Sequence, residues 1–140
     1  MADEENNARS LASINVLVVE DEKYSVIFVT SVLEAIGIVN VAVAENGIEA
    51  LEKMASGDVS VDIVICDLEM PEMGGFEFIR EVRYGTVPQF KDVPILVLTG
   101  KDNDQNINMA RIHKIEGFLV KPPDIKTLER YIREIFDIAP

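Results

Sequence analysis

The 140-residue sequence has few of the residues that cross-link chains, bind soft metals or contact nucleic acid. It contains one cysteine, Cys66, and one histidine, His113, so an internal disulfide and a thiolate or imidazole metal cluster are both excluded. Basic residues are also scarce, with 13 Lys and Arg against 25 Asp and Glu and a formal net charge of -12. Phosphate backbones and anionic membranes attract clustered Lys and Arg, so we expect no direct nucleic-acid partner and no membrane partner.

Long hydrophobic runs are missing as well. No segment approaches the roughly 20 apolar residues that a membrane-spanning helix needs, and the acidic N-terminus lacks the apolar core of a secretory signal. A lone cysteine fits a reducing compartment, so we expect a cytoplasmic protein. We predict a flexible N-terminal tail over residues 1–13 and one domain over residues 14–138, which is either a stand-alone domain or the front part of a longer protein.

Short apolar runs alternate with helical patterns along the predicted domain, as in βαβ units. Unbroken runs rich in Val and Ile are typical of parallel strands buried on both faces. They predict five strands, over residues 14–19, 39–44, 62–66, 94–98 and 117–120. Helical patterns predict the remaining elements, over residues 24–36, 46–56, 76–84 and 102–115 and from Asp124 onward. We therefore predict an α/β fold, a doubly wound (βα)5 three-layer sandwich whose five-stranded parallel sheet has the flavodoxin-like order 2-1-3-4-5.

Polar residues stand where four of these strands end. Glu20 and Asp21 follow the first strand, Asp67 the third, Thr99 the fourth and Lys121 the fifth. In an open parallel sheet, ligands bind beyond the carboxyl ends of the strands. We expect these side chains to form one site, and Glu20 and Asp21 could in addition cap the first helix.

The chemistry of these side chains points to a metal and a phosphoryl group. Three neighbouring carboxylates would repel one another without a counter-charge. A hard cation supplies it: Mg²⁺, with Mn²⁺ as a substitute, prefers such oxygen ligands, whereas an all-oxygen set argues against zinc. A carboxylate such as Asp67 can take up a phosphoryl group, which Lys121 and Thr99 would stabilise by charge and by hydrogen bonding.

The chain resembles the response-regulator receiver domain of two-component signalling over roughly residues 14–137. The resemblance is carried by short motifs at matching strand ends: Val19-Glu20-Asp21, Asp67-Leu68-Glu69-Met70-Pro71 with Gly75, Leu98-Thr99-Gly100, and Gly117-Phe118-Leu119-Val120-Lys121-Pro122. Each motif is weak alone, but all of them in this order make a specific match.

The resemblance implies that Asp67 is phosphorylated by a histidine kinase or a histidine phosphotransfer protein. It also implies a metal site made by Glu20, Asp21, Asp67 and the backbone carbonyl of Glu69. Thr99 and Lys121 would contact the phosphoryl group.

The resemblance further implies a switch. Thr99 would move toward the phosphoryl group, and the ring of Phe118 would rotate into the vacated space. This change would remodel the face made by the fourth helix, the fifth strand and the fifth helix, which would bind a downstream protein target or a fused output domain or form a homodimer. A cis Lys121-Pro122 bond is also expected, since a cis bond is least costly before proline.

One hypothesis goes beyond the family pattern. Glu69 lies two residues after Asp67, and Lys101 lies two residues after Thr99, so both should overhang the site. Their pairing would slow the spontaneous dephosphorylation of Asp67. Away from the site, we expect Cys66 in the core and His113 at the surface.

Three other functions stay open on the residues alone. An aspartyl-phosphate phosphatase of the haloacid-dehalogenase type uses similar residues around Mg²⁺, but its nucleophile ends the first strand, whereas Asp67 ends the third. A flavodoxin-like cofactor binder would need a phosphate cradle where Glu20 and Asp21 stand. A receiver-like interaction module that is never phosphorylated would keep the same fold. We favour a regulatory domain that is not an enzyme in the ordinary sense, although it takes part in its own phosphoryl transfer and dephosphorylation.

Overall fold

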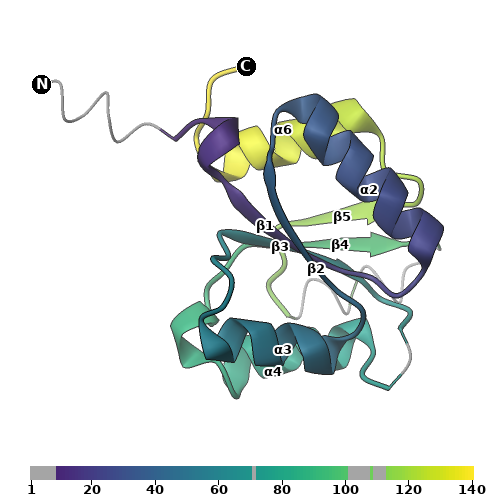
Figure 1. The fold of residues 1–140 in the computed structure, drawn as a ribbon, viewed down its shortest axis with the longest axis vertical. Helices are drawn as coiled ribbons and strands as arrows, with labels where there is room; N and C mark the ends of the chain where they lie inside the picture. The colour runs from purple at the N-terminus through teal and green to yellow at the C-terminus, as the bar shows by residue number, and fades with distance from the viewer. Residues whose placement is uncertain (1–8, 71, 101–107, 109–112) are drawn as a thin grey trace, which may run out of the picture.

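A five-stranded parallel sheet forms the centre of the molecule (Figure 1). The computed structural model describes residues 9–70, 72–100, 108 and 113–140. The strands are β1 (Asn15–Val19), β2 (Asn40–Ala44), β3 (Ile63–Asp67), β4 (Ile95–Thr99) and β5 (Gly117–Val120). Their order is β2-β1-β3-β4-β5 and every pair is parallel, which confirms the predicted fold class.

Helices cover both faces of the sheet (Figure 1). The described helices are α2 (Lys23–Ile36), α3 (Gly47–Ser56), α4 (Gly75–Tyr84) and α6 (Ile125–Ile135), with short 3-10 helices η1 (Leu11–Ser13) and η2 (Pro88–Phe90). Helices α2 and α6 contact each other on one face, and α3 and α4 contact each other on the other. The helix predicted over residues 102–115 lies almost entirely outside the described residues. Within the part of the chain that the structure describes, no helix is long and apolar enough to cross a membrane.

Local signals in the sequence set the helix ends. The side chain of Asn46 accepts a hydrogen bond from the Glu49 N–H at the start of α3, and Asp124 does the same for the Thr127 N–H at the start of α6. Gly37 ends α2 in the left-handed conformation, with φ 114°, which a residue without a Cβ adopts easily.

The core consists of two clusters, one on each side of the sheet. Alternating strand residues divide between them. The α2–α6 core cluster includes Val16, Val18, Ile63, Ile65, Leu96 and Leu98. The α3–α4 core cluster includes Leu17, Val19, Val64, Cys66, Ile95 and Val97, so Cys66 is a core residue as expected. Because both faces are covered, the interiors of β1, β3 and β4 are apolar, and their polar residues stand only at the strand ends.

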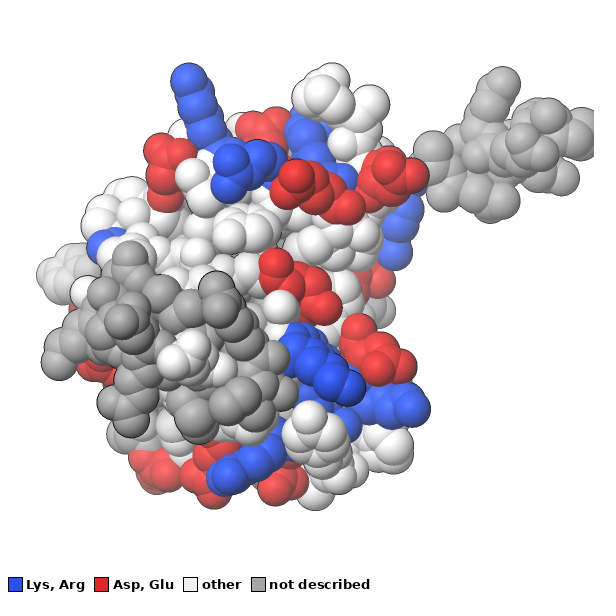
Figure 2. All heavy atoms as spheres, turned by 180° about the vertical axis from the view of Figure 1, so that it is seen from behind, with Lys and Arg blue, Asp and Glu red and all other residues white. Residues whose placement is uncertain are grey.

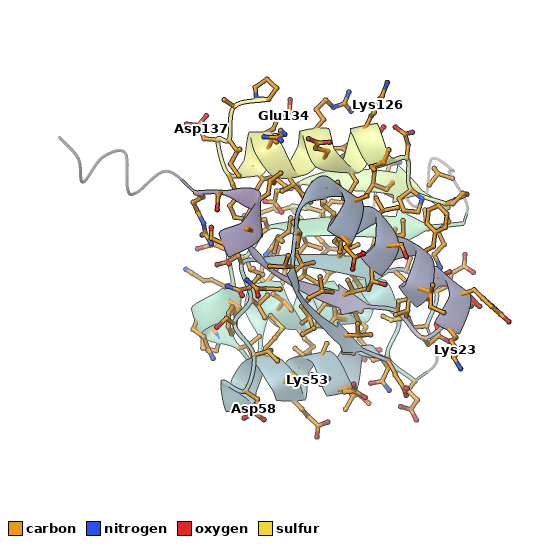
Figure 3. All side chains as sticks on the ribbon, turned by 45° about the horizontal axis from the view of Figure 1, so that its top comes forward. Lys23, Lys53, Asp58, Lys126, Glu134 and Asp137 are labelled. Atoms are coloured by element: carbon orange, nitrogen blue, oxygen red, sulfur yellow. The ribbon has the colours of Figure 1, made fainter. Side chains whose placement is uncertain are left out.

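Charged side chains lie outside these layers. Lys126 on α6 and Lys23 on α2 point away from the sheet (Figure 3). On the face shown in Figure 2, the described Lys and Arg side chains are interleaved with Asp and Glu. Mixed charges of this kind suit a solvated surface.

The N-terminal segment packs onto the domain earlier than expected. A flexible tail was predicted to residue 13, but Leu11 of η1 packs against the α2–α6 core cluster. The Arg9 guanidinium lies 2.8 Å from the Asp62 carboxylate and 5.3 Å from the centroid of the Phe136 ring. Residues 9–13 therefore contact the folded body, and residues 1–8 lie outside the described part of the chain.

Arg83 is a buried charge near the end of α4, only 9% exposed. Its guanidinium donates hydrogen bonds to the backbone carbonyls of Lys91, Val93, His113 and Lys114. The same guanidinium lies 3.4 Å from the Glu116 carboxylate. Arg83 thus ties α4 to the segments that enter β4 and β5.

The prediction that His113 lies at the surface is wrong. The residue is 7% exposed, and its ring centroid lies 6.0 Å from that of Phe76. The hydrogen bond from Arg83 to the His113 carbonyl holds this backbone against α4, where the ring packs beside Phe76. Burial, and then the Arg80 charge, lower the pKa of His113.

Replacing Arg83 tests the role of this guanidinium. We expect Arg83→Met to lower the free energy of unfolding by about 3 kcal/mol, because the four carbonyls and Glu116 lose their buried donor. Arg133→Met is the matched control, since Arg133 pairs with Glu129 in a more exposed position and should contribute less than about 1 kcal/mol. Urea denaturation followed by circular dichroism measures both, and equal losses in the two variants would contradict the assignment.

Candidate functional site

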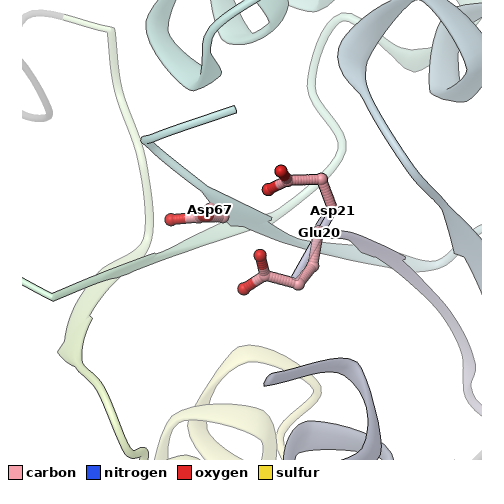
Figure 4. A group of neighbouring side chains, drawn as sticks. All are labelled: Glu20, Asp21 and Asp67. Carbon is pink, nitrogen blue, oxygen red and sulfur yellow. The ribbon is translucent and has the colours of Figure 1, made fainter. Parts of the chain in front are cut away.

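Three carboxylates meet at the carboxyl end of β1 and β3 (Figure 4). Val19 pairs with Cys66 in the parallel ladder, so the next residues, Glu20 and Asp67, leave the sheet side by side. One carboxylate oxygen from each of Glu20, Asp21 and Asp67 lies within 4.8 Å of the others. Glu20 is 1% exposed and Asp67 is 3% exposed, whereas Asp21 is open to solvent. The sheet therefore brings together the acidic residues that the sequence predicted.

Lys121 brings a positive charge to this group from the end of β5. Its Nζ lies 2.7 Å from Glu20 Oε1 and 3.3 Å from Asp67 Oδ2. The Lys121–Pro122 peptide bond is cis, as expected. One ammonium thus faces two buried carboxylates, and the site keeps excess negative charge.

Burial and charge shift the protonation of this pair. Burial raises the pKa of Glu20, the Lys121 ammonium opposes that rise, and the Asp67 charge adds to it. Burial alone would lower the pKa of Lys121, but the carboxylates of Glu20 and Asp67 outweigh it and raise that pKa. Lys121 is therefore positively charged at neutral pH.

Asp67 is the last residue of β3, and the backbone that follows holds its carboxylate. The Glu69 N–H donates to Asp67 Oδ1 at 3.2 Å, while the Gly75 N–H donates to the Leu68 carbonyl at 3.1 Å. A Cβ atom on Gly75 would lie 2.5 Å from the Asp67 carbonyl oxygen. Only glycine allows α4 to begin this close to the strand end.

Thr99 and Phe118 occupy neighbouring strands. Thr99 is the buried last residue of β4, and its carbonyl accepts a hydrogen bond from the Lys121 N–H at 2.7 Å. Phe118 pairs with Val97 across the sheet and packs, partly buried, against the α3–α4 core cluster. These positions place Thr99 at the same edge as Asp67, whereas Phe118 lies two residues before Val120, the ladder partner of Thr99 on β5.

The site opens into a cavity of about 280 Å³ lined by Asp21, Glu22, Asp67, Glu69, Gly100 and Lys121. Glu69 contributes an exposed side chain to this lining, whereas Lys101 lies outside the described residues. Four of the residues predicted for the site, Asp21, Asp67, Glu69 and Lys121, therefore line one cavity.

Glu22 is a site residue that the sequence reasoning missed. It lines the cavity and caps α2, since its carboxylate accepts hydrogen bonds from the Ser25 N–H at 2.7 Å and the Tyr24 N–H at 3.3 Å. The expectation that Glu20 and Asp21 cap this helix is therefore corrected, because α2 begins at Lys23 and Glu22 is the residue directly before it. The available signal was an acidic residue two positions before the predicted start of the helix at Tyr24.

Residues 16–133 match the family model for the response regulator receiver domain. This chain belongs to that family. It is 29% identical over 109 residues to chemotaxis protein CheY1 of Helicobacter pylori, a match that covers 78% of this chain and 86% of that protein. It is 33% identical over 109 residues to the CAI-1 autoinducer sensor kinase/phosphatase CqsS of Vibrio cholerae, covering 78% of this chain but only 15% of CqsS.

Solved receiver structures are similar in the same way. The structure of chemotaxis protein CheY4 of Vibrio cholerae matches with a TM-score of 0.76 and 33% identity, covering 87% of this chain and 98% of that one. The receiver domain of sensor histidine kinase PA1611 from Pseudomonas aeruginosa, solved with magnesium in its active-site cleft, shares the fold with a TM-score of 0.76 at 22% identity, covering 90% and 99% of the two chains. A receiver domain is a regulatory domain, which sets aside the phosphatase and the flavodoxin-like cofactor binder.

The raised pKa of Glu20 predicts how this receiver domain responds to pH. A carboxyl whose pKa is higher in the folded state destabilises the fold when ionised, so its cost is absent below pH 4.5 and appears as the pH rises. In metal-free buffer we expect Glu20→Gln to raise the free energy of unfolding by about 1 kcal/mol at neutral pH and to leave it unchanged in acid. Urea denaturation across this pH range measures the difference.

Glu22→Gln is the matched control with the opposite sign. The hydrogen bond from the Ser25 N–H, against a smaller opposing effect of burial, lowers the pKa of Glu22, so its ionised form stabilises the fold above pH 4.5. This variant should lose stability at neutral pH and match the original protein in acid. Two variants that shift in the same direction would contradict the electrostatic interpretation.

Proposed function

We propose that this receiver domain is a phosphorylation-activated signalling switch in which Asp67 accepts a phosphoryl group from a histidine kinase or a histidine phosphotransfer protein. The observation that carries the proposal is the buried Asp67 carboxylate, held by the Glu69 N–H on one oxygen and facing Lys121 at 3.3 Å on the other. An oxygen of this carboxylate attacks phosphorus, and the bond from phosphorus to the donor histidine nitrogen breaks.

The acidic cluster fits a divalent metal ion. Three carboxylates cluster here and only two of them pair with the Lys121 ammonium, and their donor set is all oxygen, which suits Mg²⁺ with Mn²⁺ as a substitute. Glu20, Asp21, Asp67 and the Glu69 carbonyl would hold the ion, which would neutralise charge on the transferred group. The fold shared with the magnesium-bound PA1611 receiver and the manganese-bound receiver Rcp1 supports this choice.

Lys121, Thr99 and Phe118 would respond to the phosphoryl group on Asp67. Lys121 would pair with a phosphoryl oxygen, and the Thr99 hydroxyl would hydrogen-bond another. Movement of Thr99 would free space for the ring of Phe118 to rotate inward. The Lys121 N–H, directly after β5, donates a hydrogen bond to the Thr99 carbonyl. Movement of Thr99 would therefore displace the end of β5 first.

The output would be a change in protein binding. The affected face would comprise residues 102–115, β5 and α6, and it would bind a downstream target or a fused output domain or pair two copies of the chain. A single buried cysteine is compatible with a cytoplasmic location, where such partners meet.

Intact mass spectrometry after incubation with acetyl phosphate tests the proposal. We expect the chain to gain one phosphoryl group in the presence of Mg²⁺ and none after chelation, because Asp67 needs its acidic neighbours neutralised before an anion can approach. Asp67→Asn should abolish the gain. Asp58→Asn, which changes an exposed aspartate beyond the end of α3, should retain it. A folded protein that gains no phosphoryl group would favour the phosphorylation-independent interaction module.

The lifetime of the phosphorylated form tests the pairing of Glu69 with Lys101. Glu69→Ala and Lys101→Ala should each speed dephosphorylation by no more than about five-fold, because an exposed ion pair is worth roughly 0–1 kcal/mol. Glu77→Ala removes an exposed glutamate from α4 and serves as the control. Unchanged lifetimes in both site variants would disprove the hypothesis.

A further inference from the structure

The loop after β3 is anchored on a helix that contributes no residue to the phosphorylation site. A Cβ atom on Gly47, the first residue of α3, would lie 2.8 Å from the sulfur of Met73, 2.9 Å from its Cγ and 3.0 Å from the Phe78 Cβ. Met73 therefore fits against α3 only because Gly47 lacks a side chain. Beside this contact, Asn46 Nδ2 donates to Glu72 Oε2 at 3.4 Å.

The same short stretch of chain is also fixed to the end of β3. Gly75 follows Met73 by two residues, and its N–H donates to the Leu68 carbonyl at 3.1 Å. A Cβ atom on Gly75 would lie 2.6 Å from the Leu68 Cα. Two backbones in such close contact shift together, because neither has room to yield.

Leu68 precedes the donor that orients the Asp67 carboxylate. The Glu69 N–H donates to Asp67 Oδ1 at 3.2 Å, which leaves Oδ2 turned toward Lys121 at 3.3 Å. A displacement of Leu68 would carry the Glu69 N–H away from Asp67 and release one oxygen of the carboxylate.

We propose that Gly47 and Met73 are positioning residues for Asp67. Their contact fixes residues 73–75, these residues fix Leu68, and Leu68 places the Glu69 N–H. The inference rests on the proposed function in that Asp67 is the group being positioned for phosphoryl transfer. It adds that the β2–α3 junction, remote in sequence from Asp67, controls the transfer rate.

Three variants test the contact: Gly47→Ala, Met73→Ala and the double variant. We expect Gly47→Ala to slow phosphorylation by acetyl phosphate and Mg²⁺ about ten-fold, since small misplacements of reacting groups are costly. Met73→Ala should also slow it, because the loop loses its anchor. In the double variant the overlap with Met73 is gone, but the methyl group added at position 47 still lies 3.0 Å from the Phe78 Cβ. The rate should therefore recover only part of the loss seen in Gly47→Ala.

Gly74→Ala is the matched control. It places the same methyl group in the same loop, but its nearest contact is the Leu68 carbonyl oxygen at an ordinary 3.7 Å. Its phosphorylation rate should therefore equal that of the original chain. If Gly47→Ala acted only by raising the helix propensity of α3, its phosphorylation rate would also equal that of the original chain.

The Glu69 amide resonance supplies a readout that needs no phosphoryl donor. It should shift in Gly47→Ala, move part of the way back in the double variant and stay unchanged in Gly74→Ala. A Gly47→Ala protein with the original Glu69 resonance would overturn the positioning role. If Gly47→Ala fails to fold, Met73→Ala, which creates no overlap, makes the same test. If the original chain takes up no phosphoryl group, the proposed function fails, while the amide shift still decides the positioning.

Discussion

Two carboxylates, Glu20 and Asp67, lie buried side by side at the end of the sheet, and one ammonium, Lys121, faces both. Buried charges are stable only when they are paired and hydrogen-bonded. Two backbone groups donate hydrogen bonds to these carboxylates: the Glu22 N–H donates to Glu20 Oε2 at 3.1 Å, and the Glu69 N–H donates to Asp67 Oδ1. The remaining negative charge would favour the divalent cation of the proposed metal site.

The parallel sheet makes this concentration of charge possible. Its strands all end at one edge, so residues far apart in the chain are delivered to one place without a long loop. Two apolar clusters hold the strands from both faces, and their burial stabilises a site that is itself costly. A rigid frame of this kind also keeps Asp67 and Lys121 from relaxing apart.

The same compactness links the site to distant surfaces. On one side, the Lys121 N–H bonds the Thr99 carbonyl, and Thr99 pairs with the 42% exposed Val120 in the β4–β5 ladder. On the other side, Gly75 seats α4 against the end of β3, and Met73 seats the preceding loop against α3. A phosphoryl group on Asp67 would therefore affect two tightly packed regions, the β4–β5 ladder and the loop before α4. Close packing favours a discrete rearrangement over gradual deformation.

The sequence by itself determined the fold class and pointed to five polar residues as a candidate site, because apolar periodicity and polar strand ends are local patterns that survive in one dimension. The strand order followed from the doubly wound fold class, not from any local pattern of the sequence. It did not reveal that Glu22 caps α2, that Arg83 and His113 are buried, or that residues 9–13 pack on the core. Those features depend on contacts between distant segments. The tertiary structure alone decided which oxygen of Asp67 faces Lys121 and which meets Glu69, since hydrogen-bond geometry is set by how strands and loops pack.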